Sequence, residues 1–91
     1  MLNIRYGCRF KKEFKKALRR EGHTIEKFTT VLEYLVEEKP LPAEYHDHKL
    51  GGKYKDYREC HIMPDWLLIY RVEQEVLTLV LSRTGSHSDL F

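Results

Sequence analysis

The chain has 91 residues, of which 42% are hydrophobic and 33% charged, and its formal net charge is +2. This size and composition exclude a disordered chain and indicate one globular domain, residues 1–91, with a modest core. The longest apolar run, Trp66–Tyr70, is too short to span a bilayer, and the apolar core of a signal peptide is missing after Met1. We therefore expect a cytoplasmic protein.

The first part of the chain predicts a strand followed by a helical hairpin. Leu2–Tyr6 alternates apolar and polar residues, as a half-buried strand does. In the helix that follows, the apolar residues recur at helical spacing: Phe10, Phe14, Ala17 and Leu18. Gly22 is placed to end this helix in a left-handed conformation, His23 fits the helix junction, and Thr24 caps a second helix. Two prolines within residues 40–42 are expected to stop the second helix. Its expected buried stripe is Ile25, Phe28, Leu32, Leu35 and Val36.

The second part of the chain predicts a loop followed by a meander of strands. The loop, residues 40–54, turns at Gly51 and Gly52. Three strand patterns follow it: Tyr57–Ile62, Trp66–Val72 and Val76–Arg83. The connections between them are short, which favours antiparallel neighbours because parallel strands need a crossover. We therefore predict an α+β fold in which the helices cover one face of a small sheet and the other face is free to bind a partner.

A strongly basic segment, Arg9–Arg20, covers the first helix and carries seven basic residues and one acidic residue. Opposite the apolar stripe, the cations are Lys11, Lys12, Lys15, Lys16, Arg19 and Arg20. A basic face on a nearly neutral protein suggests a polyanionic partner, although an ordinary solvated helix face has the same composition.

The two cysteines, Cys8 and Cys60, are expected to be reduced thiols because no secretion signal accompanies them. Their separation does not match a zinc site, which needs pairs of ligands close together in the sequence. Cys60 lies in a strand-like stretch and is expected to be buried.

Four polar residues at the ends of the predicted strands are not explained by packing: His61, Asp65, Arg83 and His87. His61 and Asp65 flank one turn of the meander. The third strand runs antiparallel to the second, so it ends where the second began and brings Arg83 and His87 to the same end of the sheet. Imidazole, carboxylate and guanidinium groups supply the base, acid and phosphate clamp that metal-independent RNA cleavage needs.

The same residues have simpler interpretations. His61 alone fits an ordinary strand position, Asp65 fits a turn, and Arg83 fits a weak surface ion pair with Glu59 or Glu73. A metal site is a further alternative, with nitrogen and oxygen ligands from His46, His48, His61, Asp65 and His87. The sequence has no Ser-His-Asp order, glycine-rich phosphate loop or HExxH motif, which argues against acyl transfer, nucleotide hydrolysis and zinc proteolysis.

Three stretches together resemble the YafQ branch of the RelE/ParE toxin superfamily. They read DHKLGG at residues 47–52, HIMPDWLLIY at residues 61–70 and RTGSHSDLF at residues 83–91. The resemblance is close over residues 41–91, whereas the helical hairpin agrees in length and pattern only. It implies a RelE-like microbial RNase fold and a type II toxin that inhibits translation by cutting mRNA in the ribosomal A site, without a metal or other cofactor.

The resemblance also implies which residues carry out the chemistry. The functional positions of the family fall on His48, His61, Asp65 and His87, with Arg83 in the same site. We assign His87 as the general acid for the leaving 5′-oxygen. Asp65, working with His61, would activate the 2′-hydroxyl, while His48 and Arg83 would hold the phosphate. An exchange of roles between His48 and His61 stays open.

Two aromatic residues and the basic helix complete the RNA surface that the resemblance implies. Trp66 and Phe91 match positions implicated in the activity of the family, and Trp66 is expected to stack on an unpaired base. Phosphates of ribosomal RNA would meet the basic residues Lys11, Lys12, Lys15, Lys16, Arg19 and Arg20.

The resemblance finally implies the partners of the protein. They are a cognate antitoxin, the ribosome with its mRNA, and operator DNA only through the antitoxin complex, with no membrane involved. There are two alternatives: a ParE-like toxin that binds gyrase, and a non-catalytic component of a DNA-binding toxin–antitoxin repressor complex. The acid–base residues favour the nuclease, because a gyrase-binding relative does not need them.

Overall fold

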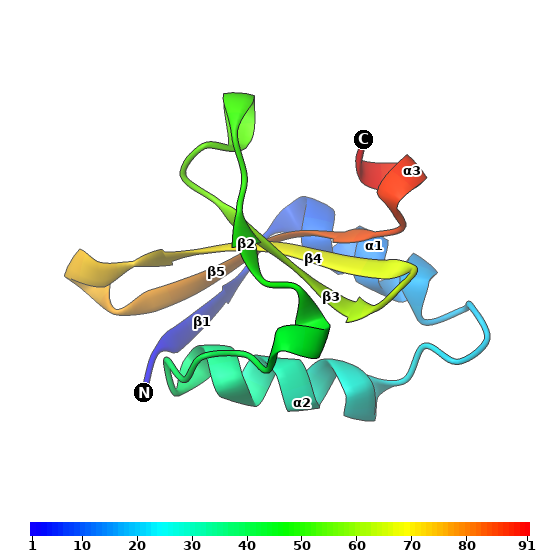
Figure 1. Cartoon of the computed structure of the whole chain (residues 1–91), viewed down its shortest axis with the longest axis horizontal. Helices are drawn as coiled ribbons and strands as arrows, with labels where there is room; N and C mark the ends of the chain where they lie inside the picture. The colour runs from blue at the N-terminus through cyan, green and yellow to red at the C-terminus, as the bar shows by residue number, and fades with distance from the viewer.

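A five-stranded sheet with the strand order β1-β5-β4-β3-β2 forms the centre of the computed structural model, which describes all of residues 1–91 (Figure 1). The strands are β1 (Asn3–Tyr6), β2 (His48–Lys49), β3 (Arg58–Met63), β4 (Trp66–Glu73) and β5 (Thr78–Gly85). The helices are α1 (Cys8–Ala17), α2 (Ile25–Val36) and α3 (His87–Leu90), with the 3-10 turns η1 (Ala43–Tyr45), η2 (Gly52–Tyr54) and η3 (Gln74–Val76). None of the helices is long and apolar enough to cross a membrane.

The predicted meander is confirmed, since β3 pairs antiparallel with β4 and β4 pairs antiparallel with β5. β1 lies parallel to β5, and the chain between them forms α1, α2 and the rest of the sheet. Two short elements, β2 and α3, were not expected. β2 adds the loop histidine His48 to the sheet opposite Glu59, and α3 carries His87.

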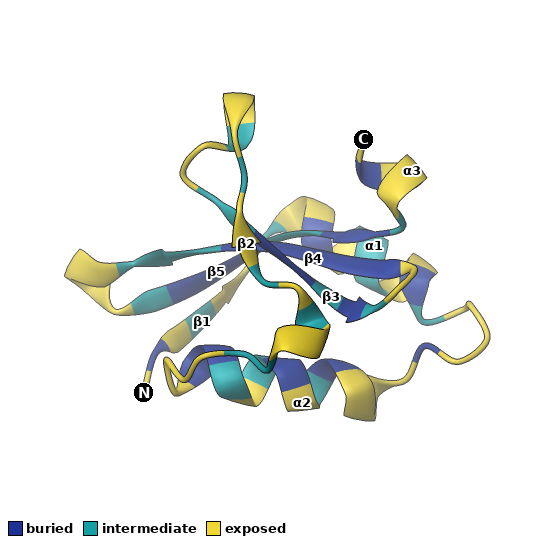
Figure 2. Ribbon diagram, viewed as in Figure 1, coloured by how far each residue is buried: buried dark blue, intermediate teal, exposed yellow.

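The main core lies between the sheet and the two long helices, so the prediction that helices cover one face is confirmed. In Figure 1, α2 runs below the sheet and α3 lies above it, at the opposite face. Figure 2 shows buried residues along β3, β4 and β5 and on stretches of α2. The cluster comprises Leu2, Phe10, Ala17, Phe28, Val31, Leu35, Val36, Cys60, Ile62, Trp66, Leu68, Tyr70, Leu79 and Leu81.

The opposite face of the sheet, here named the open face, carries a smaller apolar cluster of Leu67, Ile69 and Leu90. Side chains alternate between the faces of a sheet, and directly paired residues share a face. His61 pairs with Leu67, while Glu59 and Arg83 both pair with Ile69. The polar residues of β3 and β5 that concern the site therefore lie on the open face.

The end of the first helix was predicted incorrectly. α1 ends at Ala17, before Gly22, and the chain continues through turns to α2. Gly22 nevertheless has the predicted left-handed conformation, with φ 83°. The predicted cap of α2 is confirmed, because the hydroxyl of Thr24 accepts a hydrogen bond of 3.2 Å from the backbone N–H of Lys27.

The end and the stripe of the second helix also differ from the prediction. α2 ends at Val36 because the chain turns at Glu38, which has φ 57°, so the prolines are not the direct stop. Ile25 is 57% exposed, whereas Val31, absent from the predicted stripe, is fully buried. Ile25 occupies the first turn of the helix, where it borders a surface groove instead of the sheet.

The two cysteines are unpaired, Cys8 at the surface and Cys60 in the core, so the predicted burial of Cys60 is confirmed. Burial raises the pKa of the Cys60 thiol well above its ordinary value. Cys60 therefore stays protonated and acts as a small apolar residue of β3.

Candidate active site

The loop that carries His46 and His48 is anchored through the residue between them. The carboxylate of Asp47 accepts hydrogen bonds from Nε and Nη2 of Arg58, at 3.2 and 2.9 Å, and from the hydroxyl of Tyr70. Burial, reinforced by this carboxylate, raises the pKa of Tyr70, so the phenol remains a donor. Asp47 therefore ties the loop to β3 and β4 and places both histidines beside the open face.

A buried carboxylate, Glu59, lies between two of the predicted site histidines. Its Oε1 is 3.5 Å from Nε2 of His48 and 3.8 Å from Nε2 of His61. The side chain of Glu59 is 6% exposed, and its Oε2 is buried without a hydrogen-bond partner. Nδ1 of His48 donates to the carbonyl of His46 at 2.7 Å, which fixes the ring and directs Nε2 toward Glu59. This arrangement aligns two imidazoles on one carboxylate.

The role of Glu59 was not predicted from the sequence, in which Glu59 was considered only as a surface partner of Arg83. One signal was present in the sequence. Glu59 and His61 are two residues apart in a strand, so they share a face, and a carboxylate beside a histidine is a common orienting pair. What the sequence did not show was the short strand β2, which places His48 directly opposite Glu59.

His61 is held in its neutral form by its surroundings. Burial lowers the pKa of His61 below its ordinary value of 6.5, Glu59 opposes this effect, and the positive charges of His46, His48 and His87 add to the lowering. A neutral imidazole can accept a proton at neutral pH. Leu90 of α3 packs with Leu67, the strand partner of His61, so α3 brings His87 to the side of the sheet where His61 lies.

We expect the Glu59→Gln variant to have a still lower pKa at His61, because the substitution removes the charge that favours the imidazolium. A depressed pKa in the native state means that stability falls as the pH drops below 6.5, since the unfolded chain binds the proton first. In the variant this loss continues to a lower pH. A pH titration of the His61 ring by ¹H–¹⁵N NMR measures the shift directly, with Glu75→Gln at an exposed distant site as the control. An unchanged or higher pKa would contradict the proposed contact.

An open cleft of about 830 Å³ lies beside these histidines. Its lining comprises Glu44, Tyr45, His46, His48, His61, Ile62, Met63 and Pro64. The volume falls within the range of small-ligand clefts. The cleft therefore has room for a nucleotide next to the imidazoles of His48 and His61.

The C-terminal helix α3 holds His87 and Phe91 in place. Ser86 and Asp89 cap the helix reciprocally, through hydrogen bonds of 3.2 and 3.0 Å, and Arg20 pairs with Asp89 at 3.1 Å. His87 is exposed, and its ring centroid lies 5.3 Å from that of Phe91. The closing residues therefore form a braced helix that presents an accessible imidazole.

Arg83 is already engaged by protein groups. Its guanidinium forms an ion pair with Glu13 and a 3.4 Å hydrogen bond to the hydroxyl of Tyr54, and its side chain is 11% exposed. The hydrogen bond with Glu13 is the main cause of a raised pKa of Arg83. The alternative of a surface pair with Glu59 or Glu73 is wrong. The phosphate-clamp role stays a prediction, and it requires the guanidinium to exchange its partner.

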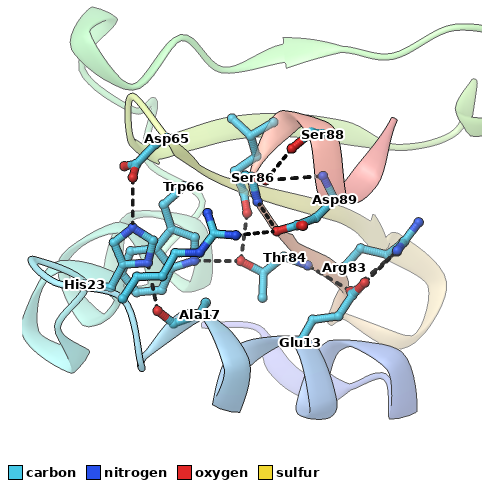
Figure 3. Close-up of polar contacts among 12 residues, drawn as sticks. Glu13, Ala17, His23, Asp65, Trp66, Arg83, Thr84, Ser86, Ser88 and Asp89 are labelled. Atoms are coloured by element: carbon cyan, nitrogen blue, oxygen red, sulfur yellow. Dashed lines mark hydrogen bonds and ion pairs between the residues drawn. The ribbon is translucent and has the colours of Figure 1, made fainter.

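The prediction that Trp66 stacks on an RNA base is wrong, because the indole is fully buried. Its ring lies parallel to that of His23, with centroids 4.5 Å apart and an interplanar angle of 5°. Its Nε1–H donates to the hydroxyl of Thr84 at 2.8 Å. Figure 3 shows Trp66 beside His23 and Thr84, and its burial together with these contacts makes it a structural residue.

Asp65 lies apart from the other predicted site residues. It forms no hydrogen bond with His61, and its one polar partner is Nε2 of His23, 3.4 Å from Oδ2. His23 occupies the helix junction as predicted, but its approach to Asp65 was not foreseen. The structure thus gathers His48, His61 and Glu59 directly, brings His87 to the same face, and places Asp65 at the neighbouring turn.

The basic residues of the first helix and its continuation are all exposed, in agreement with the prediction of a basic surface. Among them only Arg20 forms an ion pair, the one with Asp89. The metal alternative finds no support in the geometry, because no three His, Cys, Asp or Glu side chains are placed to hold an ion together.

Known proteins resemble this chain over its whole length. Residues 2–91 match the family model described as "Bacterial toxin of type II toxin-antitoxin system, YafQ". The mRNA interferase toxin YafQ of Escherichia coli strain K12 is 38% identical over 90 residues, which cover 98% of this chain and 95% of that protein. A chain of the crystal structure of the E. coli DinJ-YafQ complex superposes with a TM-score of 0.87 at 37% identity, covering 100% of this chain and 99% of that chain. A metal-bound toxin from Helicobacter pylori superposes with a TM-score of 0.92 at 42% identity, covering 100% of both chains.

Proposed function

This chain belongs to the YafQ family of type II toxins, and we propose that it is an endoribonuclease that cuts mRNA in the ribosomal A site and so inhibits translation. The observation that carries the proposal is the alignment of His48 and His61 on the buried carboxylate of Glu59 beside an open cleft. The relative from E. coli that is named an mRNA interferase matches nearly the full chain. One cytoplasmic domain, residues 1–91, carries the activity.

The first step of the reaction is activation of the 2′-hydroxyl next to the scissile phosphate. This step requires the bound RNA to bring that hydroxyl within reach of both His61 in the cleft and the exposed carboxylate of Asp65 at the neighbouring turn. His61, kept neutral by burial, then accepts the hydroxyl proton, and Asp65 orients the hydroxyl. Glu59 stabilises the imidazolium that forms on His61. The 2′-oxygen then attacks phosphorus, and a bond from the 2′-oxygen to phosphorus forms.

The second step is departure of the 5′-oxygen. Its bond to phosphorus breaks, and His87, exposed on α3, donates a proton to it. His48 and Arg83 stabilise the negative charge that develops on the phosphate oxygens. The products are a 2′,3′-cyclic phosphate and a 5′-hydroxyl end, and no metal or other cofactor takes part.

The proposal is tested by inducing the toxin in cells and mapping the 5′ ends of mRNA. New ends in frame with codons, suppressed when the cognate antitoxin is coexpressed, are expected. Growth arrest without new ends, accompanied by inhibition of DNA supercoiling, would replace the nuclease with a gyrase-binding toxin. Persistence of cutting in purified ribosomes after treatment with a transition-metal chelator such as TPEN tests metal independence.

The basic surface is proposed to bind ribosomal RNA through phosphate contacts. We expect Lys11→Glu with Lys12→Glu to weaken ribosome binding, and the slope of log affinity against log salt to fall by about one for each lost contact. Ribosome pelleting at rising salt measures both quantities. The matched control, Lys39→Glu with Lys55→Glu, makes the same charge change outside this surface. Equal binding by both double variants would remove the basic surface from the RNA interface.

The protein is proposed to form a complex with a cognate antitoxin, by analogy with the E. coli DinJ-YafQ complex. An acidic or amphipathic antitoxin segment that folds on binding fits the basic and catalytic surface. Operator DNA would be contacted by the antitoxin, because the basic surface of the toxin is then covered.

A further inference from the structure

His23 lies directly beneath Asp65, in the corner between α1 and α2 (Figure 3). Its side chain is 1% exposed. One edge of the ring contacts the carbonyl of Ala17, with Nδ1 2.9 Å from the oxygen, and the other edge faces Asp65. The face of the ring is stacked on Trp66. The imidazole is therefore held on two edges and one face.

These contacts determine which nitrogen of His23 carries hydrogen. A carbonyl oxygen only accepts, so Nδ1 is the donor to Ala17. The neutral ring then presents a lone pair on Nε2 toward Oδ2 of Asp65, and two acceptors cannot form a hydrogen bond. The contact is attractive only when a proton lies between them, either on Nε2 or on Oδ2. A hydrogen bond between the two side chains therefore requires one proton, held by either His23 or Asp65.

Asp65 is the anion that the His23 ring faces. The other charged groups around the cavity that His23 borders are Glu13 and Lys16 from α1, Arg20 from the turn after it, and Asp89 from α3. Glu13 and Asp89 are already paired, with Arg83 and Arg20 respectively. From α2, the ammonium of Lys27 donates to the carbonyl of Gly22 at 2.9 Å. No other anion forms a hydrogen bond with the His23 ring.

We propose that His23 is a positioning residue for catalysis, which orients the Asp65 carboxylate through a shared proton. The side chain of Asp65 is 62% exposed and has no other hydrogen-bond partner, so without His23 it would rotate freely. With Oδ2 held by His23, Oδ1 is left to meet the 2′-hydroxyl of the RNA. Trp66 supports the arrangement, because its bond to Thr84 fixes the ring on which His23 stacks. The inference rests on the proposed nuclease function for its effect on rate, but the shared proton can be observed without it.

Two substitutions at His23 separate the hydrogen bond from the packing. His23→Gln places an amide donor near the position of Nε2 and removes the titration, whereas His23→Phe keeps a ring for stacking and removes both hydrogen bonds. We expect His23→Phe to slow single-turnover cleavage of ribosome-bound mRNA on the order of 10²-fold, because a loosely held group loses its alignment. His23→Gln should retain most of the rate but lose one ionisation from the pH–rate profile. Ribosome affinity should be unchanged in both.

The Asp65→Asn variant supplies the coupling test. In this background His23→Phe should cause no further loss of rate, because the group that it positions is gone. NMR of the free toxin gives an independent readout. The Nε2–H of His23 should give a signal that is protected from solvent exchange, and this protection should fall in Asp65→Asn.

The outcomes of these experiments are separable. Wild-type rates and pH profiles in folded His23→Gln and His23→Phe, or an Nε2–H signal of His23 that Asp65→Asn leaves unchanged, would overturn the inference. If His23→Phe does not fold, the His23→Gln profile and the Nε2–H signal still decide the matter. A wild-type toxin that cuts no mRNA would instead refute the proposed function, and the Nε2–H signal alone would then decide whether the proton is shared.

Discussion

His87→Ala is expected to slow cleavage of ribosome-bound mRNA by 10²-fold or more, the usual contribution of a general acid. The structure explains why this loss should come without unfolding. His87 is exposed on α3, its side chain makes no hydrogen bond within the chain, and the helix is held by Ser86, Asp89 and Arg20 instead. Single-turnover kinetics on programmed ribosomes measure the rate, and urea denaturation checks that stability is retained.

A chemical test identifies the step at which His87 acts. A substrate with sulfur in place of the leaving 5′-oxygen needs no proton to depart, so the His87→Ala variant should cut it nearly as fast as the wild-type enzyme does. Ser88→Ala, at the next exposed position of α3, is the matched control and should keep full activity on both substrates. A large deficit of His87→Ala on the sulfur substrate would mean that His87 positions RNA or stabilises charge and does not act as the acid.

Trp66→Ala is expected to lower the free energy of unfolding by about 3–5 kcal/mol, the range for removing a large aromatic side chain from a core. The indole is fully buried, stacks on His23 and donates to Thr84, so the substitution leaves a cavity and an unpaired hydroxyl lone pair. Urea denaturation measures the change. Trp66→Phe should be less harmful, because it retains the stacked ring and loses only the hydrogen bond and part of the volume.

Phe91→Ala is the informative comparison for Trp66→Ala. Phe91 is 57% exposed beside His87, so its truncation should change the free energy of unfolding by less than about 1 kcal/mol while reducing cleavage. The two aromatic residues that the family resemblance marks would then act differently, Trp66 through the fold and Phe91 at the site. A Trp66→Ala variant with native stability and lost RNA binding would restore the stacking role and contradict the structural one.

Local patterns in the sequence were sufficient for most of the fold. Period-two and helical spacing identified β1, the meander and both long helices, because these patterns reflect which side of an element meets the core. The strand directions correctly predicted that the end of β5 returns to the start of β4. Boundaries were less predictable. After α2, the chain turns at Glu38 in a left-handed conformation, which glycine and asparagine usually adopt. Nothing in the local sequence indicates this turn.

The sequence by itself determined the family, the α+β architecture and the set of residues that can transfer protons or bind phosphate, because these follow from residue type and spacing along the chain. Only the tertiary structure decided how those residues are used. Glu59 joins His48 and His61 through the unpredicted β2 pairing, Glu13 occupies the Arg83 guanidinium, and His23 reaches Asp65 across the helix corner. Except for Glu59 and His61, the partners in these contacts lie 11 to 70 positions from each other in the sequence. The partner of each charged side chain therefore depends on which group of opposite charge lies nearest in the folded chain. The same holds for Trp66, because its burial depends on the packed core and cannot be inferred from a tryptophan next to an aspartate in the sequence.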